Sequence, residues 1–448
     1  LRAPRGDATE AIILAAPYRN SRGDLNEGGI ALLMTLARYF ERWSIWSKDI
    51  VFLITEDNLA GPRAWLDAYH EIHDTTSVTS LQSKAGAIQE AVILEYASTS
   101  HRFDSIVIHY DGNNGQLPNL DLVNAAVVCA NVDIGADVDF ANGSSRGETY
   151  QERLRTVVRG MATQGLGLPS YHGMFVEFKI DAITIEVVPN ENGRLDDIQL
   201  GRTIESLTRS LNNLMERLHH AFFFYLMIST NRFASIATCL PSAMLIAASF
   251  TVTAIGMWME SFRRSPKKPP KISTTVIERA PDASKEEPAC LFTDVQFALG
   301  TVSLYCFGIV FAVIENLIIP SSIRHIRQYA PVIHETALFI KTFSHFATGM
   351  CLSTLSTLNF PLALTNGVLA ASFLLVKPTR PGWERTLTST VIRLLSPLSM
   401  VVLLAGANKF VEVPTHIVEQ ATYGLSGIVY FCVFLPAYLA AQIVIHLS

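Results

Sequence analysis

The chain divides into two halves that differ in their pattern of apolar and polar residues. In the first half, short apolar runs such as Glu10–Ala16 and Asp49–Thr55 alternate with amphipathic segments. Runs of this length and composition are typical of strands buried on both faces. From Phe233 onward, long uncharged stretches predominate. The pattern predicts an α/β domain over residues 1–220 and an α-helical membrane domain over residues 233–448.

The first half is expected to alternate strands and helices. Strands are expected at Glu10–Ala16, Asp49–Thr55, Ser105–His109 and Ala182–Val188. Helices are expected at Asn26–Arg42, Pro62–Ile72, Ala85–Tyr96, Asn119–Ala130 and Thr149–Thr163. Such alternation predicts a largely parallel sheet covered by helices on both faces, which is an α/β/α arrangement.

The junction between the halves is rich in leucine and aromatic residues. Residues Arg202–Tyr225 have a helical pattern, and the aromatic stretch FFFYLMI begins near the end of this range. This stretch is too short to cross a bilayer and suits a helix lying in the membrane interface over residues 221–232. A helix packed against the soluble domain is the alternative.

The second half contains several segments that are apolar enough to enter a membrane. Phe233–Trp258 carries no charge and is long enough to cross a hydrocarbon core of about 30 Å. Further apolar runs occur at Val295–Ile319, Thr336–Leu358, Leu362–Val376, Ser389–Ala405 and Tyr423–His446. The pattern predicts a bundle of about six spans.

Charge and composition give the expected topology. The chain has 448 residues, of which 17% are charged, and a net charge of −5, so it shows no electrostatic footprint for nucleic acid. Lysine and arginine gather after the first span, which places the linker 261–290 in the cytosol and the α/β domain in the lumen. The sequon at Asn142 fits a lumenal domain that carries a glycan.

Polar groups within the spans are candidate functional residues because they are costly in lipid. Glu315 and Asn316 lie near one end of a predicted span, and Pro436 interrupts the last one. Pro436 removes an amide donor and frees a carbonyl, which either kinks the helix or helps to hold a lipid head group. Lys341 and Arg393 either have a function or extend to the interface.

The first 190 residues resemble zinc aminopeptidases that hold two metal ions. In that family one strand ends in His-x-Asp, a later one in Glu-Glu and another in a ligand Asp. A bridging Asp beside an Asn and a final His complete the set. Two of these positions are replaced here: Arg19 stands at the His-x-Asp pair, and Leu25 stands at the bridging Asp, beside a retained Asn26. The other positions keep possible ligands. Glu56 and Asp57 form the acidic pair, His109 or Asp111 corresponds to the ligand Asp, and His172 corresponds to the final His.

These replacements indicate an emptied metal site. Two zinc ions need about five well-placed donors, and a cation such as Arg19 would repel them. We therefore expect a vestigial cleft that holds no metal or other cofactor. A single metal bound by Asp57, His172 and either His109 or Asp111 remains an alternative. Cys129 lies in an apolar stretch predicted to be helical and is a poor candidate nucleophile.

Longer motifs resemble a second family, the GPI-anchor attachment subunits of the GPI transamidase. They are SKDIVFLITEDNLAGPRAWLDAYHEI at 47–72, GNNGQLPNLDL at 112–122 and LNNLMERLHHAFFFYLM at 211–227. The resemblance implies a multi-pass protein of the endoplasmic reticulum with a lumenal, peptidase-like domain and a further N-terminal span. It implies partnership with a caspase-like catalytic subunit and other membrane subunits. It also implies non-catalytic presentation of the GPI lipid, with Pro436 involved in lipid recognition.

Two other functions are weighed against this one. The chain could itself be a metal-dependent peptidase or peptide synthetase that forms the amide bond. That alternative would be favoured if the isolated protein held zinc and if neutralising substitutions at Glu56 and Asp57 removed both the zinc and the activity. A transporter is suggested only by the number of spans, and no inverted repeat supports it.

Overall fold

The computed structural model describes residues 1–76, 79–97, 101–141, 149–166, 170–214, 224–264, 333–374, 376, 383–394, 437–438 and 441. They fall into two compact units. The described parts of the first unit lie in Leu1–Leu245 and Leu352–Asn366. Those of the second lie in Ile246–Cys351, in Gly367–Val418 and in Val429–Ser448.

The first unit is built on a seven-stranded sheet with the order β2-β1-β3-β6-β4-β5, in which β7 also pairs with β4. The strands are β1 (Glu10–Pro17), β2 (Asp49–Thr55), β3 (Ala87–Glu95), β4 (Arg102–His109), β5 (Asp137–Phe140), β6 (Asp181–Pro189) and β7 (Leu195–Asp196). Neighbouring strands are parallel except that β4 runs antiparallel to β6 and to β7. The prediction of a largely parallel sheet is confirmed.

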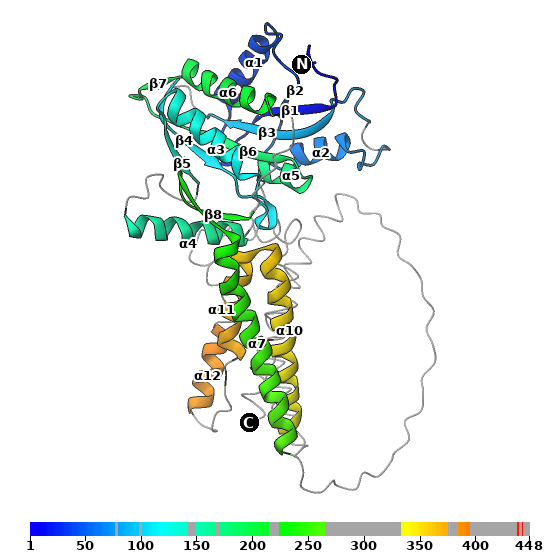
Figure 1. Ribbon diagram of the computed structural model, residues 1–448, viewed down its shortest axis with the longest axis vertical. Coiled ribbons are helices and arrows are strands. Elements are labelled where there is room, and N and C mark those ends of the chain that lie inside the picture. The colour runs from blue at the N-terminus through cyan, green and yellow to red at the C-terminus, as the bar shows by residue number, and fades with distance from the viewer. Residues whose placement is uncertain are drawn as a thin grey trace. The chain divides into compact units, whose positions relative to one another are not determined.

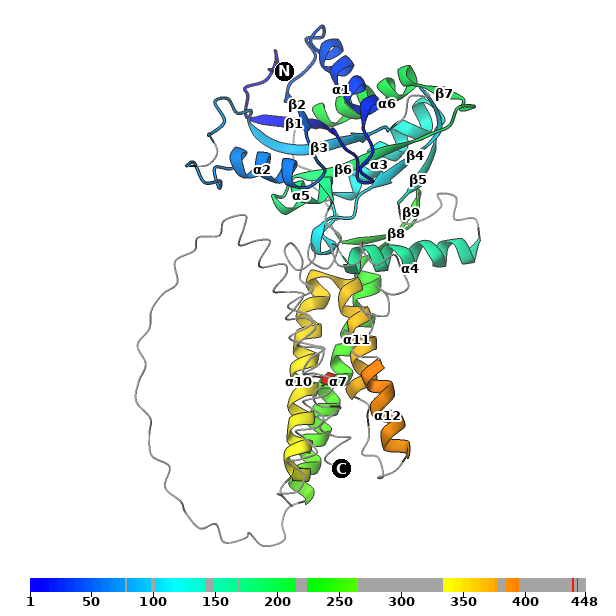
Figure 2. The ribbon, with the colours of Figure 1, turned by 180° about the vertical axis from the view of Figure 1, so that it is seen from behind.

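Helices cover both faces of this sheet (Figures 1 and 2). On β1, Ile12 and Leu14 pack into one core and Ile13 into the other, because successive side chains point to opposite faces. The first core includes α1 (Glu27–Phe40), α3 (Leu120–Val128) and α6 (Asp197–Asn212), and the second includes α2 (Ala60–Tyr69) and α5 (Tyr171–Glu177). The α/β fold class is therefore confirmed.

One predicted helix is a strand. The segment Ala85–Tyr96 forms β3, between β1 and β6 near the middle of the sheet. Its residues from Ala91 to Glu95 are all buried, so apolar residues occupy both faces and the alternation that identifies a strand is lost. The β-branched residues Ile88, Val92 and Ile93 favour the strand.

The predicted interfacial helix at 221–232 is also wrong where the structure describes it. Residues Tyr225–Ser229 and Arg232–Ser235 form an antiparallel hairpin, β8 and β9, and the preceding helix α6 ends at Asn212. Tyr225 is buried, and its hydroxyl donates to the Pro118 carbonyl at 3.0 Å. The aromatic residue is thus used for packing within the first unit.

The hairpin packs against α4 (Tyr150–Leu166). A Cβ added to Gly160 of α4 would lie 3.4 Å from Leu226 Cδ1 of β8, so the helix backbone lies close to the hairpin. After β9 the chain enters α7 (Ile236–Arg264) directly.

The described elements of the second unit are helices. They are most of α7 and of α10 (Ile333–Leu358), part of α11 (Phe360–Leu374) and the whole of α12 (Trp383–Leu394). Gly349 of α10 lies so close to α7 that a Cβ would fall 2.7 Å from Thr251 Cγ2. Small residues at such crossings allow helices to approach closely. Lys341 Nζ donates to the Val376 carbonyl at 2.7 Å, so it binds within the unit.

The prediction of about six spans is not confirmed. Among the described residues, one helix, Ile236–Glu260, is long and apolar enough to cross a membrane. The shorter apolar helix Phe360–Phe373 falls below the roughly 20 residues that a span needs. The predicted spans at 295–319 and 423–446 lie outside the described residues, apart from 437–438 and 441. Helix α7 continues through Ser261–Arg264, so the first four residues of the predicted linker are helical.

A buried carboxyl in the sheet makes the stability of the first unit depend on pH. Burial raises the pKa of Glu90 on β3 to about 7, although Lys48 Nζ lies 3.8 Å away. Because the folded state holds this proton more tightly, stability falls as the pH rises above 4.5 and the full penalty is present above about 7. We expect Glu90→Gln to stabilise the first unit by about 3 kcal/mol at pH 8 and to have little effect at pH 4.

Urea denaturation of the chain in detergent at the two pH values measures this difference. The matched control is Glu10→Gln, because Glu10 lies 3.5 Å from the same lysine but is 37% exposed. Because water screens the partly exposed carboxylate of Glu10, the control should change stability by less than about 1 kcal/mol. Equal effects of the two substitutions would contradict the assignment to burial.

Candidate functional site

A cluster of polar side chains lies on β3, β4 and β6 and on the loop after β1. Glu95 ends β3, and its register partner on the neighbouring strand β6 is Glu186. His109 ends β4, and its Nε2 lies 2.8 Å from Glu186 Oε2. Arg22 forms an ion pair with Glu186 Oε1, and the Ser21 hydroxyl donates to Glu95 Oε2 at 3.1 Å. We call these five residues the polar cluster.

The two carboxyl groups of the polar cluster differ in electrostatic environment. Hydrogen bonding from His109 lowers the pKa of Glu186, and the charge of Arg22 acts in the same direction. Burial raises the pKa of Glu95. Glu186 is thus a carboxylate held between two basic groups, whereas Glu95 has only a hydroxyl and an amide from Ser21 as hydrogen-bond donors.

His172 is buried close to this cluster and is neutral. Burial lowers its pKa to about 3. Its Nε2 lies 3.0 Å from the Asp111 carbonyl oxygen, which can only accept, so Nε2 carries the proton. Nδ1 then accepts from the Thr184 hydroxyl at 2.9 Å. Both nitrogens of His172 are engaged within the protein, and neither offers a free lone pair to a metal.

In the acidic pair that follows β2, Asp57 makes a structural contact. Asp57 Oδ1 accepts from the Gly61 amide at 2.5 Å, near the start of α2. Glu56 is exposed. The sequence-based alternative of a metal held by Asp57 and His172 therefore does not fit, because each predicted ligand already has protein partners. Among the residues that the structure describes, no group of three or more His, Cys, Asp or Glu side chains could hold a metal ion.

Arg19, which we expected in the vestigial metal site, is not part of the polar cluster. It is exposed, and its guanidinium donates to the Gly23 carbonyl at 3.0 Å. The cation of the polar cluster is Arg22, three residues later. Asp111 contributes its backbone carbonyl to His172, while its carboxylate accepts from Thr163 at 3.0 Å.

Asn26 is fully buried and joins two strands. Its amide nitrogen donates to the carbonyls of Pro17 at 2.9 Å and Leu94 at 2.8 Å, and its oxygen accepts from the Tyr96 amide at 2.6 Å. These contacts tie the end of β1 to the end of β3. The retained asparagine therefore fixes the backbone on both sides of Glu95.

Glu95 and Glu186 are not among the site residues predicted from the sequence. The sequence pattern predicts a helix where β3 lies, so it does not mark Glu95, at the end of VILE, as the end of a strand. The remaining predicted site residues, Asn142, Glu315, Asn316 and Pro436, lie outside the described residues.

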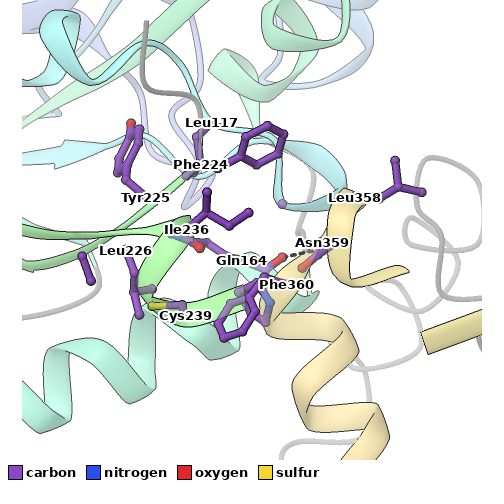
Figure 3. Close-up of a pocket in the computed structure, with 13 residues that line it drawn as sticks. Leu117, Gln164, Phe224, Tyr225, Leu226, Ile236, Cys239, Leu358, Asn359 and Phe360 are labelled. Carbon is purple, nitrogen blue, oxygen red and sulfur yellow. Dashed lines mark hydrogen bonds between the residues drawn. The ribbon is translucent and has the colours of Figure 1, made fainter. Parts of the chain in front are cut away.

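Two hollows lie elsewhere in the first unit. A groove of about 410 Å³ runs between α1 and α6, and it is lined by residues such as Leu32, Tyr39 and Gly201. At its rim His101 Nδ1 lies 2.6 Å from Asp197 Oδ2. A smaller pocket of about 30 Å³ is lined by residues from β8, α4 and the turn between α10 and α11 (Figure 3).

Asn359 forms one wall of the smaller pocket. It is buried, and its side-chain amide donates to the Asn114 carbonyl at 2.9 Å and to the Gln164 carbonyl at 3.0 Å; Figure 3 draws the bond to Gln164. Its oxygen accepts from the Leu362 amide at 3.0 Å. This one side chain connects the α10–α11 turn to α4 and to the loop after β4, all within the first unit.

Comparison with known proteins gives a family for the whole chain. A family profile described as "Gaa1-like, GPI transamidase component" matches residues 1–441. The chain belongs to the Gaa1-like family. The match covers the α/β unit and continues through the helices of the second unit.

Curated members of the Gaa1-like family are found in two yeasts. The chain is 38% identical to "GPI transamidase component gaa1" of Schizosaccharomyces pombe over 270 residues, which cover 58% of this chain and 45% of that protein. It is 37% identical to "GPI transamidase component GAA1" of Saccharomyces cerevisiae over 267 residues, which cover 58% and 42%. The chain thus spans less than half the length of the curated relatives it matches.

Solved structures similar to this Gaa1-like chain include two bacterial aminopeptidases. The LapA aminopeptidase of Legionella pneumophila has a TM-score of 0.31 and 14% identity, covering 47% of this chain and 54% of that protein. A zinc aminopeptidase of Bacillus subtilis has a TM-score of 0.29 and 14% identity, covering 46% and 47%.

Proposed function

We propose that this chain is a non-catalytic component of the GPI transamidase in the membrane of the endoplasmic reticulum. In this role it binds and presents the GPI lipid and scaffolds the catalytic, cysteine-protease-like subunit. The family description supports membership of the complex. The α/β unit would lie in the lumen, and α7 would carry the chain across the bilayer.

The observation that carries the non-catalytic role is the internal pairing of the polar cluster. Glu186 is neutralised by His109 and Arg22, and His172 has no free lone pair. A hydrolytic zinc ion needs three protein ligands and an open position, and a general base needs a lone pair facing the substrate. These groups are instead engaged by partners within the protein, which favours a structural role for them.

No activated nucleophile is evident in the described part of the α/β unit. Cys129 is half-buried at the end of α3, and burial raises the pKa of its thiol. A raised pKa lowers the fraction of thiolate and hence the reactivity. The nucleophile that forms the acyl-enzyme would therefore come from a partner subunit.

Transamidation still needs an amine to be positioned against a thioester while water is excluded. A protein can supply this positioning without chemistry of its own. In the proposal the predicted spans hold the acyl chains and the base of the GPI glycan, and Glu315, Asn316 and Pro436 contact its polar part. The α/β unit, with a glycan at Asn142, holds the catalytic subunit.

Reconstitution of the transamidase with Pro436→Leu tests the lipid-binding part of the proposal. We expect the complex to assemble, while GPI binding and GPI transfer both fall several-fold. Val433→Leu, in the same predicted span, is the matched control and should leave both unchanged. Normal binding and transfer by the Pro436 variant would contradict this part.

Metal analysis of the same complex tests the non-catalytic part. Stoichiometric zinc that disappears together with GPI transfer in a Glu95→Gln variant would favour the alternative, a metal-dependent peptide synthetase or peptidase. We expect no such coupled loss.

A further inference from the structure

Helix α4 presents an apolar stripe to solvent. Tyr150, Leu154 and Val158 are 72%, 48% and 57% exposed, and their spacing of four places them on one face of the helix. Arg155 and Arg159 are also exposed and directly follow two of them in sequence. The opposite face is buried, where Gly160 lies against Leu226 of the hairpin. A helix packed on one side therefore carries a second apolar stripe with basic residues beside it.

The same helix lies where the chain leaves the α/β fold for apolar helices. The hairpin that packs on α4 continues at Ile236 into α7, the candidate span. One turn after Gly160, the Gln164 carbonyl of α4 accepts from Asn359 in the α10–α11 turn. Ile236–Leu245 and Leu352–Asn366 belong to the same unit as α4. Figures 1 and 2 both show α4 beneath the β8–β9 hairpin, next to the start of α7.

We infer that α4 is an interfacial helix that lies on the bilayer surface. Its stripe of Tyr150, Leu154 and Val158 enters the boundary between head groups and acyl chains, and Arg155 and Arg159 bind anionic head groups. An apolar face combined with basic residues is the pattern of helices that lie in the plane of the membrane. The sequence predicted an interfacial helix at 221–232, and α4 takes that role instead.

Charge and location favour lipid over a protein partner. Helix α4 contains three arginines and one glutamate, which complements an anionic lipid surface. The C-terminal part of α4 lies beside the start of α7, because Gln164 and Ile236 line the same pocket. A bilayer that contains α7 therefore lies within reach of the helix. The inference rests on α7 crossing the membrane, which is part of the proposed function.

Fluorescence quenching in the full chain tests the inference. The native cysteines are replaced by alanine, and single cysteines at Val158, Ile198 or Leu245 are labelled with an environment-sensitive fluorophore. The protein is placed in nanodiscs of phosphatidylcholine and phosphatidylserine that contain spin-labelled quencher lipids. Ile198 on α6 is the matched control because it is 68% exposed, and Leu245 on α7 reports insertion of the span because it is 71% exposed.

We expect the label at Val158 to be quenched most strongly by a spin label near the head group. The label at Leu245 should also be quenched, and the label at Ile198 should not. The double substitution Arg155→Glu/Arg159→Glu should reduce quenching at Val158 about twofold or more, without changing quenching at Leu245.

Three results would overturn the inference. If Val158 stays exposed to water while Leu245 is quenched, α4 does not lie on the bilayer, and the proposed function is unaffected. If Val158 becomes protected only when the other transamidase subunits are added, its partner is a protein. If Leu245 is not quenched, α7 does not cross the bilayer, and the membrane part of the proposed function fails as well.

Discussion

Replacing Asn26 with aspartate should lower the free energy of unfolding of the α/β unit by about 3–5 kcal/mol at neutral pH. The side chain is fully buried, and its amide donates to two backbone carbonyls, those of Pro17 and Leu94. A carboxylate cannot donate, so two carbonyls would lose their partner and a negative charge would face them. Only the hydrogen bond from the Tyr96 amide would survive.

The expected pH dependence distinguishes this cause from simple misfolding. A buried carboxyl that faces carbonyls has a raised pKa in the folded state, so the defect is full at neutral pH. As the pH falls, the carboxyl takes up a proton, regains one donor and recovers part of the lost stability. Urea denaturation of the chain in detergent at pH 5 and pH 7.5 measures this recovery.

The control for this prediction is Asn192→Asp, which introduces the same charge at an exposed position. It should change stability by less than about 0.5 kcal/mol at either pH. If Asn26→Asp were equally mild, the two carbonyl contacts would not be what holds β1 to β3.

Much of this fold follows from the apolar pattern of the sequence. Strands β1 and β2 are continuous apolar runs between polar segments, and the helix after β1 keeps a clear helical spacing with Leu33 and Leu36 buried. These signals are local, so the prediction placed the elements correctly. The order of the strands in the sheet depends on contacts far apart in the sequence, and the pattern does not contain it.

The errors arose where tertiary packing overrides local pattern. Strand β3 is buried on both faces, so its apolar positions fit a helical period as well as a strand. Tyr225 belongs to an aromatic run that suits a membrane interface. It nevertheless stacks on Tyr110 inside the first unit, with 6.0 Å between the ring centroids. In both cases the burial that decides the structure comes from partners distant in sequence.

The family pattern named Asn26, Asp57 and His172 as candidate site residues, but it did not contain their roles. Hydrogen-bond partners decide what each residue does, and these partners, such as Thr184 for His172, cannot be inferred from spacing. Arg22 forms an ion pair that only the register of β6 brings within reach.

Replacing Asn359 with aspartate should detach the α10–α11 turn from the rest of the first unit without unfolding the sheet. The carboxylate keeps the acceptor that binds the Leu362 amide at the start of α11, where negative charge is favourable. It loses both donors to the carbonyls of Asn114 and Gln164. We expect a local cost of about 2 kcal/mol, which corresponds to roughly 30-fold faster opening.

Hydrogen exchange of the chain in detergent measures this opening. The amide of Gln116, which donates to the Asn113 carbonyl in the loop that Asn359 holds, should exchange faster, while amides of β1 and β3 should not. Gly115→Ala perturbs the same contact from the other side, because its added Cβ would lie 2.5 Å from Asn359 Nδ2. Thr357→Ala is the control, since its hydroxyl bonds only to the Thr354 carbonyl of its own helix.

The two perturbations should not add, because each breaks the same set of contacts. A double variant that opens no faster than Asn359→Asp alone would support a single connection between the α10–α11 turn and the loop after β4. Additive effects would instead mean that Gly115 and Asn359 act separately. In that case the turn would be held mainly by the apolar wall of the pocket in Figure 3, where Leu117, Phe224 and Phe360 lie. Exchange near Asn113 would then depend on the size of those side chains, and loss of the two amide donors would have little effect.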